Sequence, residues 1–390
     1  MISVKDAIEK IKNTTEKGSV CRININEALN HTLAKEILSP ISMPPFNQSA
    51  MDGYAIHIHK DPTYALIGEI KAGDTSKFDL QPGQAIRIFT GGAVPNGANA
   101  VVKQEIVIRK DNTISISEPI KIDANIRPIG EQVQQNDLAF KKGTFLNAGA
   151  IGYLATLGLT EVEVYKKPRI TIIATGNELT KPGQKLDLGK IYESNTFMLQ
   201  AALKSTGFEA NILTVEDDYD ATRNTIQNAL NKSDALILTG GISVGDYDFV
   251  SDALNEIGVQ NIFYKVKQKP GKPLYYGKLN KKAIFALPGN PAAALSCFYI
   301  YVLSALNGMM GNENGGLKSI QLSLKSTYKK SPNLTHFLKG KMEGNEVEIL
   351  PAQSSAMLSS FVRANCIVVA EEEKEEWNMG DTVNTLILPQ

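Results

Sequence analysis

The sequence predicts a multidomain α/β protein with a mostly parallel sheet, a helical segment before it and β-rich regions on both sides. Between residues 168 and 315, strand-like apolar runs alternate with helical segments of ten or more residues, which is typical of βαβ units. Short strands between Gly, Pro and Asn turns fill residues 54–140 and again 316–390. A chain of 390 residues is also long for one hydrophobic core. We therefore expect about two to four domains, in the order α, β, α/β, β.

The composition shows no global charge bias. Hydrophobic residues make up 43% and charged residues 21% of the chain, and 41 basic side chains balance 41 acidic ones. Such a chain gives no electrostatic reason to expect nucleic-acid binding, so any anion site must be local. Cys21, Cys297 and Cys366 are far apart and lack metal spacing, which favours a reducing compartment.

Membrane and export signals are not expected. The N-terminus has acidic residues and no apolar signal-peptide core. The longest apolar run, 292–306, looks too short to span a bilayer and carries Ser296 and two tyrosines. The sequence therefore predicts a cytoplasmic protein with neither a membrane nor a nucleic-acid partner.

The first 40 residues predict two helices. Val4, Ala7, Ile8 and Ile11 have amphipathic helical spacing. A second helix is expected over 25–34, capped by Asn26. The following segment, SPISMPPFNQSAMDGYAI, has three prolines and is expected to be extended or looped.

Two β-rich regions flank the α/β region. In the first, the predicted strands are YALIGEI, QAIRIFTG, AVVKQEIVIR and TISISEP, and a helix over 148–157 and a strand over 161–165 follow them. In the second, the predicted strands are SIQLSLKS, HFLKGKM, EVEILPA, CIVVAEEE and TVNTLIL.

The α/β region is expected to contain four parallel strands, each followed by a helix. The strands are predicted at 169–174, 210–215, 235–238 and 284–287. The helices are predicted at 194–205, 221–231, 246–257 and 292–306. Because the carboxyl ends of parallel strands meet at one edge, the turns after these strands should converge.

Each of these strands ends in a polar or glycine-rich turn: residues 175–178, 216–218, 239–241 and 288–291. Glycine turns expose backbone N–H groups to phosphate, and carboxylates such as Glu178, Asp217 and Asp248 could hold Mg²⁺ through water. The alternative is that Gly and Asp simply terminate strands, which explains one such cluster better than four together. No P-loop or GxGxxG motif occurs, so neither a P-loop NTPase nor a nicotinamide enzyme is favoured.

A basic hairpin lies between the last two of these turns. It carries Lys265, Lys267, Lys269 and Lys272 around a Pro-Gly turn. Flexible ammonium groups suit phosphate or oxyanion binding as point charges. A solvated charged hairpin is the alternative, and the position between two ligand-type turns argues against it.

Two further segments are ambiguous from spacing alone. Asp52 either reaches into a neighbouring site or caps its own turn, and the Thr90 turn has the same two readings. The four histidines form no metal motif. The residues themselves therefore lead to an anion-binding α/β site, with a divalent cation, flanked by β domains.

The sequence resembles the molybdopterin molybdenumtransferase family, which includes bacterial MoeA and the gephyrin E domain. The matching segments occur in family order along nearly the whole chain: PPFNQSAMDGYAI, RIFTGGAVPNGANAVVKQE, NIRPIGE, GAIGYLATLG, ITIIATGNEL, IYESNT, LTGGISVGDYD, KPGKP and LPGNP. The resemblance implies an elongated homodimer with four domains and an α/β domain similar to molybdopterin adenylyltransferases. We expect a helical domain of 1–45 with 139–167, a β-rich domain of 46–138, an α/β domain of 168–315 and a barrel-like β domain of 316–390.

The resemblance also implies a reaction and its site. Molybdate would be inserted into adenylyl-molybdopterin with Mg²⁺, releasing AMP and molybdenum cofactor. The implied catalytic residues are Asp52, Thr90, Glu178, Asp217 or Asp218, Asp248, Lys265 and Lys269, with Glu178, Asp217 and Asp248 at the metal. The implied residues for pterin, phosphate and molybdate are Arg127, Thr239, Gly240, Gly241, Ser243, Lys272, Pro288, Gly289, Asn290, Pro291, Lys339 and Ser355. Asp52, Thr90 and Arg127 would reach the partner subunit's α/β domain.

Four positions depart from the family pattern. Gln132 and Asn99 stand where the family often has carboxylates, and Ala293 stands in place of a serine. Lys339 replaces a common arginine, which weakens bidentate binding of an oxyanion. Ser355 still matches a family serine.

Two other functions stay open at this point. One is adenylyl transfer from ATP to molybdopterin, which the shared α/β domain allows and the extra β domains disfavour. The other is a gephyrin-like dimeric scaffold. A molybdopterin adenylyltransferase and acceptor apoenzymes are further possible partners.

Overall fold

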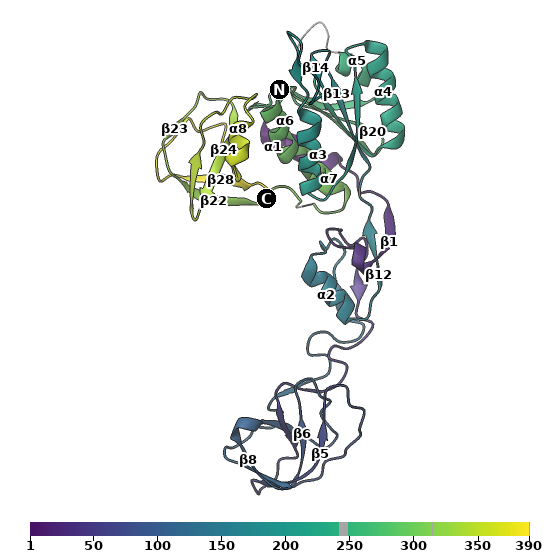
Figure 1. Ribbon diagram of the computed structural model, residues 1–390, viewed down its shortest axis with the longest axis vertical. Helices are drawn as coiled ribbons and strands as arrows, with labels where there is room; N and C mark the ends of the chain where they lie inside the picture. Colours follow the sequence, from purple (N-terminus) through teal and green to yellow (C-terminus); the bar gives the residue numbers. More distant parts are fainter. Residues whose placement is uncertain (242–248, 314, 390) are drawn as a thin grey trace. The chain divides into compact units, whose positions relative to one another are not determined.

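The structure, a computed structural model, describes residues 1–241, 249–313 and 315–389 (Figure 1). The chain forms two compact units. The first contains Met1–Arg22, Asn30–Ala34 and Glu163–Gln390, and the second contains Ile23–Leu29 and Lys35–Val162. The boundaries of the four expected domains stay a prediction.

The first predicted helix is present and the second is not. Helix α1 (Val4–Thr14) begins at Ser3, whose Oγ accepts a hydrogen bond from the Asp6 amide at 3.0 Å. The prediction of a helix over 25–34 was wrong, because strand β1 (Val20–Asn24) leads into a single 3₁₀ turn, η1 (Ile25–Glu27). The side chain of Asn24, not Asn26, caps this turn. Leu29 and Asn30 then form a turn, after which Leu33 pairs with Val164 in an isolated bridge and the Ala34 amide donates to the Glu163 carbonyl.

The second unit is built on a six-stranded sheet in the order β7-β4-β6-β5-β9-β8. The strands are β4 (Gly53–Ile56), β5 (Thr63–Ile70), β6 (Gln84–Ile88), β7 (Ala100–Lys103), β8 (Val107–Lys110) and β9 (Thr113–Ile116), with a 3₁₀ turn η2 (Gln104–Ile106). Both faces of the sheet are covered, since alternate residues of β4 enter different cores: Tyr54 one and Ala55 the other. The predicted strands YALIGEI, QAIRIFTG and TISISEP are confirmed, whereas AVVKQEIVIR is not one strand, because η2 divides it into β7 and β8.

Shorter elements complete the second unit. Two-stranded pairs join β2 (Ile37–Leu38) to β11 (Leu138–Phe140) and β3 (Gln48–Ser49) to β10 (Ile126–Arg127). Helix α2 (Ala148–Thr156) confirms the predicted helix over 148–157, and the side chain of Asn147 caps it. Strand β12 (Glu161–Tyr165) follows, and its residues from Glu163 on belong to the first unit.

The α/β sheet of the first unit has the order β16-β13-β17-β21-β20-β18. The parallel strands are β13 (Ile170–Thr175), β16 (Ala210–Val215), β17 (Ala235–Thr239) and β21 (Lys282–Leu287), and they confirm the predicted βαβ region. Strands β20 (Tyr275–Leu279) and β18 (Gln260–Tyr264) extend the sheet as an antiparallel pair. The excursion from β13 to the next helix holds a small pair, β14 (Leu179–Thr180) and β15 (Ile191–Tyr192).

Helices cover both faces of this sheet (Figure 1). On one face, Ile172, Ile237 and Phe285 pack with residues of α1, α3 (Asn195–Ser205), α6 (Pro291–Cys297) and α7 (Leu303–Met309). On the other face, Ile173, Leu238 and Ile284 pack with α4 (Tyr219–Lys232) and α5 (Phe249–Glu256). The alternation follows from the period of two along a strand. The region is therefore a three-layer α/β structure.

The last helix of this region is longer than predicted. It runs continuously from Pro291 to Met309 through a π-helical turn, η3 (Phe298–Val302), for 19 residues. The expectation that it is too short for a membrane span was wrong, because by length and composition the helix qualifies. However, 78% of its most apolar window is buried inside the protein, as in a core helix.

The C-terminal strands form a closed β-barrel. Strands β24 (Thr335–Glu343), β25 (Glu346–Ile349), β22 (Ser319–Leu324), β28 (Thr382–Ile387) and β26 (Cys366–Ala370) pair in this order, and β26 pairs back to β24. Strand β19 (Gln268–Lys269), from the α/β region, adds to β24. A small pair, β23 (Tyr328–Lys329) with β27 (Glu376–Trp377), and helix α8 (Ser359–Arg363) complete the domain. The predicted barrel-like fold is confirmed.

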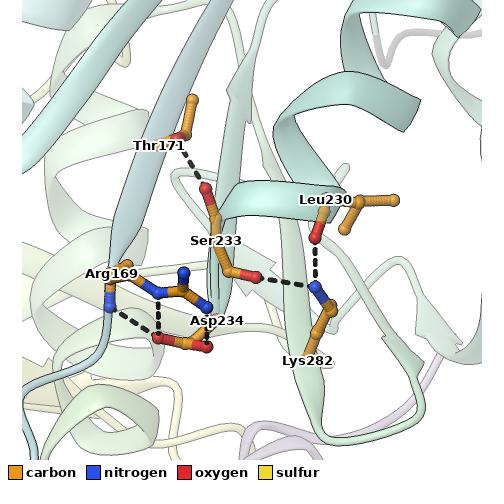
Figure 2. Close-up of polar contacts among 6 residues, drawn as sticks. All are labelled: Arg169, Thr171, Leu230, Ser233, Asp234 and Lys282. Carbon is orange, nitrogen blue, oxygen red and sulfur yellow. Dashed lines mark hydrogen bonds and ion pairs between the residues drawn. The ribbon is translucent and has the colours of Figure 1, made fainter.

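A polar network closes the amino-terminal edge of the α/β sheet (Figure 2). The guanidinium of Arg169 donates two hydrogen bonds to Asp234, at 3.0 and 3.1 Å. The ammonium of Lys282 donates to the carbonyls of Leu230 and Ser233, where α4 ends. These cations therefore hold strand and helix ends in place at this edge.

Candidate functional site

The turns that follow β13, β16, β17 and β21 begin at the same edge of the sheet. Thr239 is in register with Ala174 on one side and Leu287 on the other, and Thr175 is in register with Val215. The four strands therefore end within one residue of each other. The order β16-β13-β17-β21 reverses direction between β13 and β17, which is where open α/β sheets bind ligands.

The turn after β17 requires glycine. Gly240 has φ +89° and Gly241 has φ +60°. A Cβ atom at Gly240 would lie 2.3 Å from the carbonyl oxygen of Thr175, so no other residue fits without moving backbone. Among the described residues, the buried hydroxyl of Thr175 has no hydrogen-bond partner. Ser243, expected here, lies outside the described residues.

Asn195 connects two of the turns and is not among the site residues predicted from the sequence. Its Nδ2 donates to Thr239 Oγ1 at 2.7 Å and to the Gly289 carbonyl at 2.8 Å. Asn195 is the first residue of α3, which reaches this edge from β13. The segment IYESNT contained the signal, since a polar side chain at a helix start beside the ligand edge is a candidate for binding or positioning.

The acidic residues have different tasks. Asp217 Oδ2 accepts a hydrogen bond from the Asn177 amide at 3.0 Å, and Asn177 Oδ1 accepts one from the Asp217 amide at 3.1 Å. This reciprocal pair ties the turn after β16 to the turn after β13. Asp218 instead caps α4, because its Oδ1 accepts from the Ala221 amide at 2.8 Å. Glu178 is exposed beside them, and Asp248 lies outside the described residues.

The sequence did not decide between Asp217 and Asp218 as the acid of the metal site. Asp218 caps α4, so Asp217 is the one whose carboxylate is not used as a helix cap. Mg²⁺ needs only one or two carboxylates when substrate phosphates supply further oxygens, and Glu178 and Asp217 are donors of that kind. No group of three or more His, Cys, Asp or Glu side chains suited to a metal occurs in the described ranges.

The Pro288–Pro291 turn meets the C-terminal domain within the same unit. Asn290 Nδ2 donates to Ser355 Oγ at 3.0 Å, and the Ala293 amide donates to the Ser355 carbonyl at 3.1 Å. Lys339 lies nearby in β24, only 1% exposed, with Nζ 3.3 Å from the Ser354 carbonyl. The predicted residues Asn290 and Ser355 are therefore brought together, and Lys339 reaches the same loop.

Burial of Lys339 destabilises the charged form of its side chain. Desolvation lowers its pKa to about 8, from an ordinary value of 10.5. The folded chain therefore binds this proton more weakly than the unfolded chain does.

Lys339→Met is expected to raise stability at pH 7 by about 1 kcal/mol or more, because a long apolar side chain replaces a buried cation. In the parent protein, stability gains from deprotonation as the pH rises from about 8 to 10.5, and the variant should lack that gain. Thermal unfolding of both proteins across this pH range measures the effect. Equal melting temperatures and equal pH slopes would contradict it.

The basic loop, residues 265–272, connects the antiparallel strands β18 and β20. Lys267 forms an ion pair of 2.8 Å with Glu372, so it is occupied by the C-terminal domain. Lys269 and Lys272 are exposed, and Lys265 has an unusual φ of +65° with its ammonium 4.7 Å from the Tyr264 ring centre. The loop thus presents three of its four lysines.

Asp52 and Thr90 are in contact within the second unit, and Arg127 lies on a short strand of the same unit. Asp52 Oδ1 accepts from the Thr90 amide at 2.8 Å and from Thr90 Oγ1 at 2.7 Å. These hydrogen bonds lower the pKa of Asp52 and keep it ionised. Asp52 therefore caps the Thr90 turn and not its own. Strand β3 connects the group, because it pairs with Arg127 through Gln48 and bonds to the segment that follows Thr90.

Three of the departures from the family pattern have clear places. The Asn99 side chain accepts a hydrogen bond from the Ile58 amide at 2.8 Å, a structural role. Ala293 is buried in α6, and Gln132 is exposed.

Three family descriptions match consecutive parts of the chain. They are "MoeA N-terminal region (domain I and II)" over residues 2–158, "Probable molybdopterin binding domain" over 171–308 and "MoeA C-terminal region (domain IV)" over 321–388. Together they cover the second unit, the α/β region and the barrel.

Curated relatives match over nearly their whole length. A "Molybdopterin molybdenumtransferase" of Staphylococcus epidermidis is 32% identical over 399 aligned positions, covering 99% of this chain and 95% of the relative. One of Haemophilus influenzae is 35% identical over 373 positions, covering 93% and 92%. The crystal structure of a molybdopterin biosynthesis moeA protein from Pyrococcus horikoshii superposes with a TM-score of 0.86 at 27% identity, covering 99% of this chain and all of the other. This chain therefore belongs to the molybdopterin molybdenumtransferase family.

Proposed function

We propose that this protein is the enzyme that inserts molybdate into adenylyl-molybdopterin, in the biosynthesis of molybdenum cofactor. One observation carries the proposal: in a chain that matches the family from end to end, two glycine turns, the Asp217 turn and Asn195 meet at the carboxyl edge of one sheet. This edge offers backbone N–H groups for a phosphate and carboxylates for a cation, which are the groups that an adenylylated pterin requires.

The pterin phosphate is expected to lie over the two glycine turns. Thr239, Gly240, Gly241 and Ser243 would form one side of its cradle, and Pro288, Gly289, Asn290 and Pro291 the other. Close backbone approach is possible because Gly240 and Gly241 carry no side chain. Asn195 would keep the two turns at a fixed separation through its bonds to Thr239 and Gly289.

The reaction breaks the phosphoanhydride and releases AMP. A water oxygen, or a molybdate oxygen whose bond to molybdenum then breaks, forms the new bond to the AMP phosphorus, and the anhydride oxygen leaves with its electron pair on the pterin phosphate. The dithiolene sulfurs bind molybdenum in place of an oxygen ligand, which departs in water or in AMP as the thiols lose their protons. Lys265, Lys269 and Lys272 would offset the charge that develops on the leaving phosphate. Lys339, Asn290 and Ser355 would face the molybdate, where their proximity in this unit supports the assignment.

Glu178, Asp217 and Asp248 would hold Mg²⁺. The cation would supply charge neutralisation at the phosphate oxygens. Asp52, Thr90 and Arg127 would complete the site from the partner subunit of a homodimer, in the cytoplasm. Sedimentation of the purified protein as a monomer at assay concentrations, with full activity, would contradict the shared site.

The reaction is tested by incubating the purified protein with adenylyl-molybdopterin, Mg²⁺ and molybdate and measuring AMP. AMP should appear only when molybdate is present. Molybdate-independent release, or consumption of ATP with free molybdopterin, would indicate a different reaction and overturn the proposal.

A further inference from the structure

A buried glutamine on the core side of the basic loop, Gln268, hydrogen-bonds to the loop backbone. Gln268 is 1% exposed, and Tyr301, from the π-helical turn η3, is fully buried next to it. The Tyr301 hydroxyl donates to Gln268 Oε1. Gln268 Nε2 donates to the Gly271 carbonyl at 2.9 Å and lies 3.4 Å from Cys297 Sγ. One end of the amide is thus anchored in the core helix, and the other end holds the loop.

Burial also fixes the direction of the hydrogen bond from Tyr301. It raises the pKa of the Tyr301 hydroxyl well above the ordinary value of 10, so the group keeps its proton and donates. The same burial raises the pKa of Cys297 to about 12, so the thiol stays neutral. The cluster therefore has one protonation state at physiological pH and one hydrogen-bond pattern.

Close packing at Gly271 keeps the basic loop from moving closer to the core. Gly271 has φ +86°, and a Cβ atom there would lie 2.5 Å from Cys297 Sγ and 3.0 Å from Gln268 Nε2. The Gly271 backbone therefore packs directly against the cluster of Gln268, Cys297 and Tyr301. This packing fixes the distance between the loop and the helix that carries Cys297 and Tyr301.

The same short strand carries the anchor and a lysine. In β19, Gln268 pairs with Thr335 and Lys269 pairs with His336 of the barrel. Because side chains alternate along a strand, Gln268 points into the core and Lys269 is exposed. Lys272 follows one residue after Gly271 and is also exposed. The positions of Lys269 and Lys272 thus depend on the backbone that Gln268 holds.

We propose that Gln268 and Tyr301 are positioning residues for Lys269 and Lys272, which set these two ammonium groups at the spacing that the phosphates of the substrate need. The proposal rests on the proposed function, since it assigns the partners of the two lysines. A cluster that served core stability alone would leave substrate affinity unchanged when its hydrogen bond is lost.

Tyr301→Phe in the full-length protein is the test. We expect KM for adenylyl-molybdopterin, and the dissociation constant of AMP measured by calorimetry, to rise about two- to tenfold, the worth of one buried hydrogen bond. The turnover number should change less, because the lysines remain present. Gln268→Met, which removes both anchor contacts at similar length, should give the same direction of change if Tyr301→Phe fails to fold.

Tyr276→Phe is the matched control. Tyr276 is equally buried in the same unit, but its hydroxyl bonds to Thr14 at 3.0 Å, in α1. It should lose melting temperature as Tyr301→Phe does and keep the parent KM and AMP affinity. Equal KM and AMP affinity in the parent, Tyr301→Phe and Gln268→Met proteins would overturn the positioning role. A parent protein that binds AMP but never releases it from adenylyl-molybdopterin would overturn the proposed reaction, while the AMP affinities would still decide the role of Gln268.

Discussion

Asp217→Asn is expected to lower the rate of molybdate insertion by about a hundredfold or more, while the protein stays folded. The substitution keeps an oxygen that can accept from the Asn177 amide, so the tie between the turns after β13 and β16 is retained. It removes the negative charge that, with Glu178 and Asp248, would hold Mg²⁺ at the substrate phosphates. Losing one fixed electrostatic contact to a transition state typically costs about 10²–10³ in rate. AMP release at saturating substrate, measured over a range of Mg²⁺ concentrations, gives the effect.

The adjacent Asp218 provides the control. Asp218 caps α4 through the Ala221 amide, so Asp218→Ala should cost about 1 kcal/mol of stability and leave AMP release near the parent rate. The two carboxylates are neighbours in the chain, so the pair separates a charge in the site from a charge near it. A large loss of rate in Asp218→Ala, with Asp217→Asn active, would reverse the assignment.

The strands and turns of the α/β region could be predicted from the sequence because their signals are local. Apolar runs such as 235–238 and 284–287 are each followed by glycine two residues later, and parallel pairing brings their ends together whatever the helices between them do. The meeting of these turns at one edge therefore follows from composition and order alone. Thr239, Gly240 and Asn290 were predicted as candidate site residues in this way.

Partners that lie far apart in the chain could not be predicted. Lys267 looked equivalent to Lys269, but it pairs with Glu372, 105 residues later. The role of Gln268 could not be predicted from its position in a basic hairpin. Its hydrogen-bond partner, Tyr301, lies in a helix whose sequence shows only an apolar run. Asp52 was ambiguous for the same reason, since Thr90 is 38 residues away.

The wrong helix at 25–34 shows tertiary pairing overriding a local pattern. The apolar residues of this segment have helical spacing, but Asn30 adopts φ +62° and Leu33 pairs with Val164 as an extended residue. A short segment has little helical stability of its own, so a few strand contacts are enough to redirect it. Sequence patterns are therefore weakest where a segment is short and its partner distant.

Gly240→Ala is expected to abolish most activity and also destabilise the α/β region. Gly240 has φ +89°, where a side chain costs about 1–3 kcal/mol, and its Cβ would lie 2.3 Å from the Thr175 carbonyl oxygen. The Thr175 backbone belongs to the central sheet and cannot move without a large energetic cost, so the turn after β17 must shift instead. A displacement of about 1 Å in a positioned group costs on the order of a hundredfold in rate. Melting temperature and AMP release should therefore both fall.

Gly289→Ala distinguishes ligand approach from strain at the same edge. The nearest atom to a Cβ at Gly289 is the Gly240 Cα, at 3.8 Å, which is ordinary contact, and the residue is not in the left-handed region. The variant should therefore melt as the parent does, and only a ligand resting on the Gly289 backbone would meet the new methyl group. A raised KM with an unchanged melting temperature would indicate that the phosphate cradle extends across both turns. Unchanged kinetics in Gly289→Ala, beside an inactive Gly240→Ala, would confine the cradle to the turn after β17, because the methyl group would then point into space that the substrate does not use.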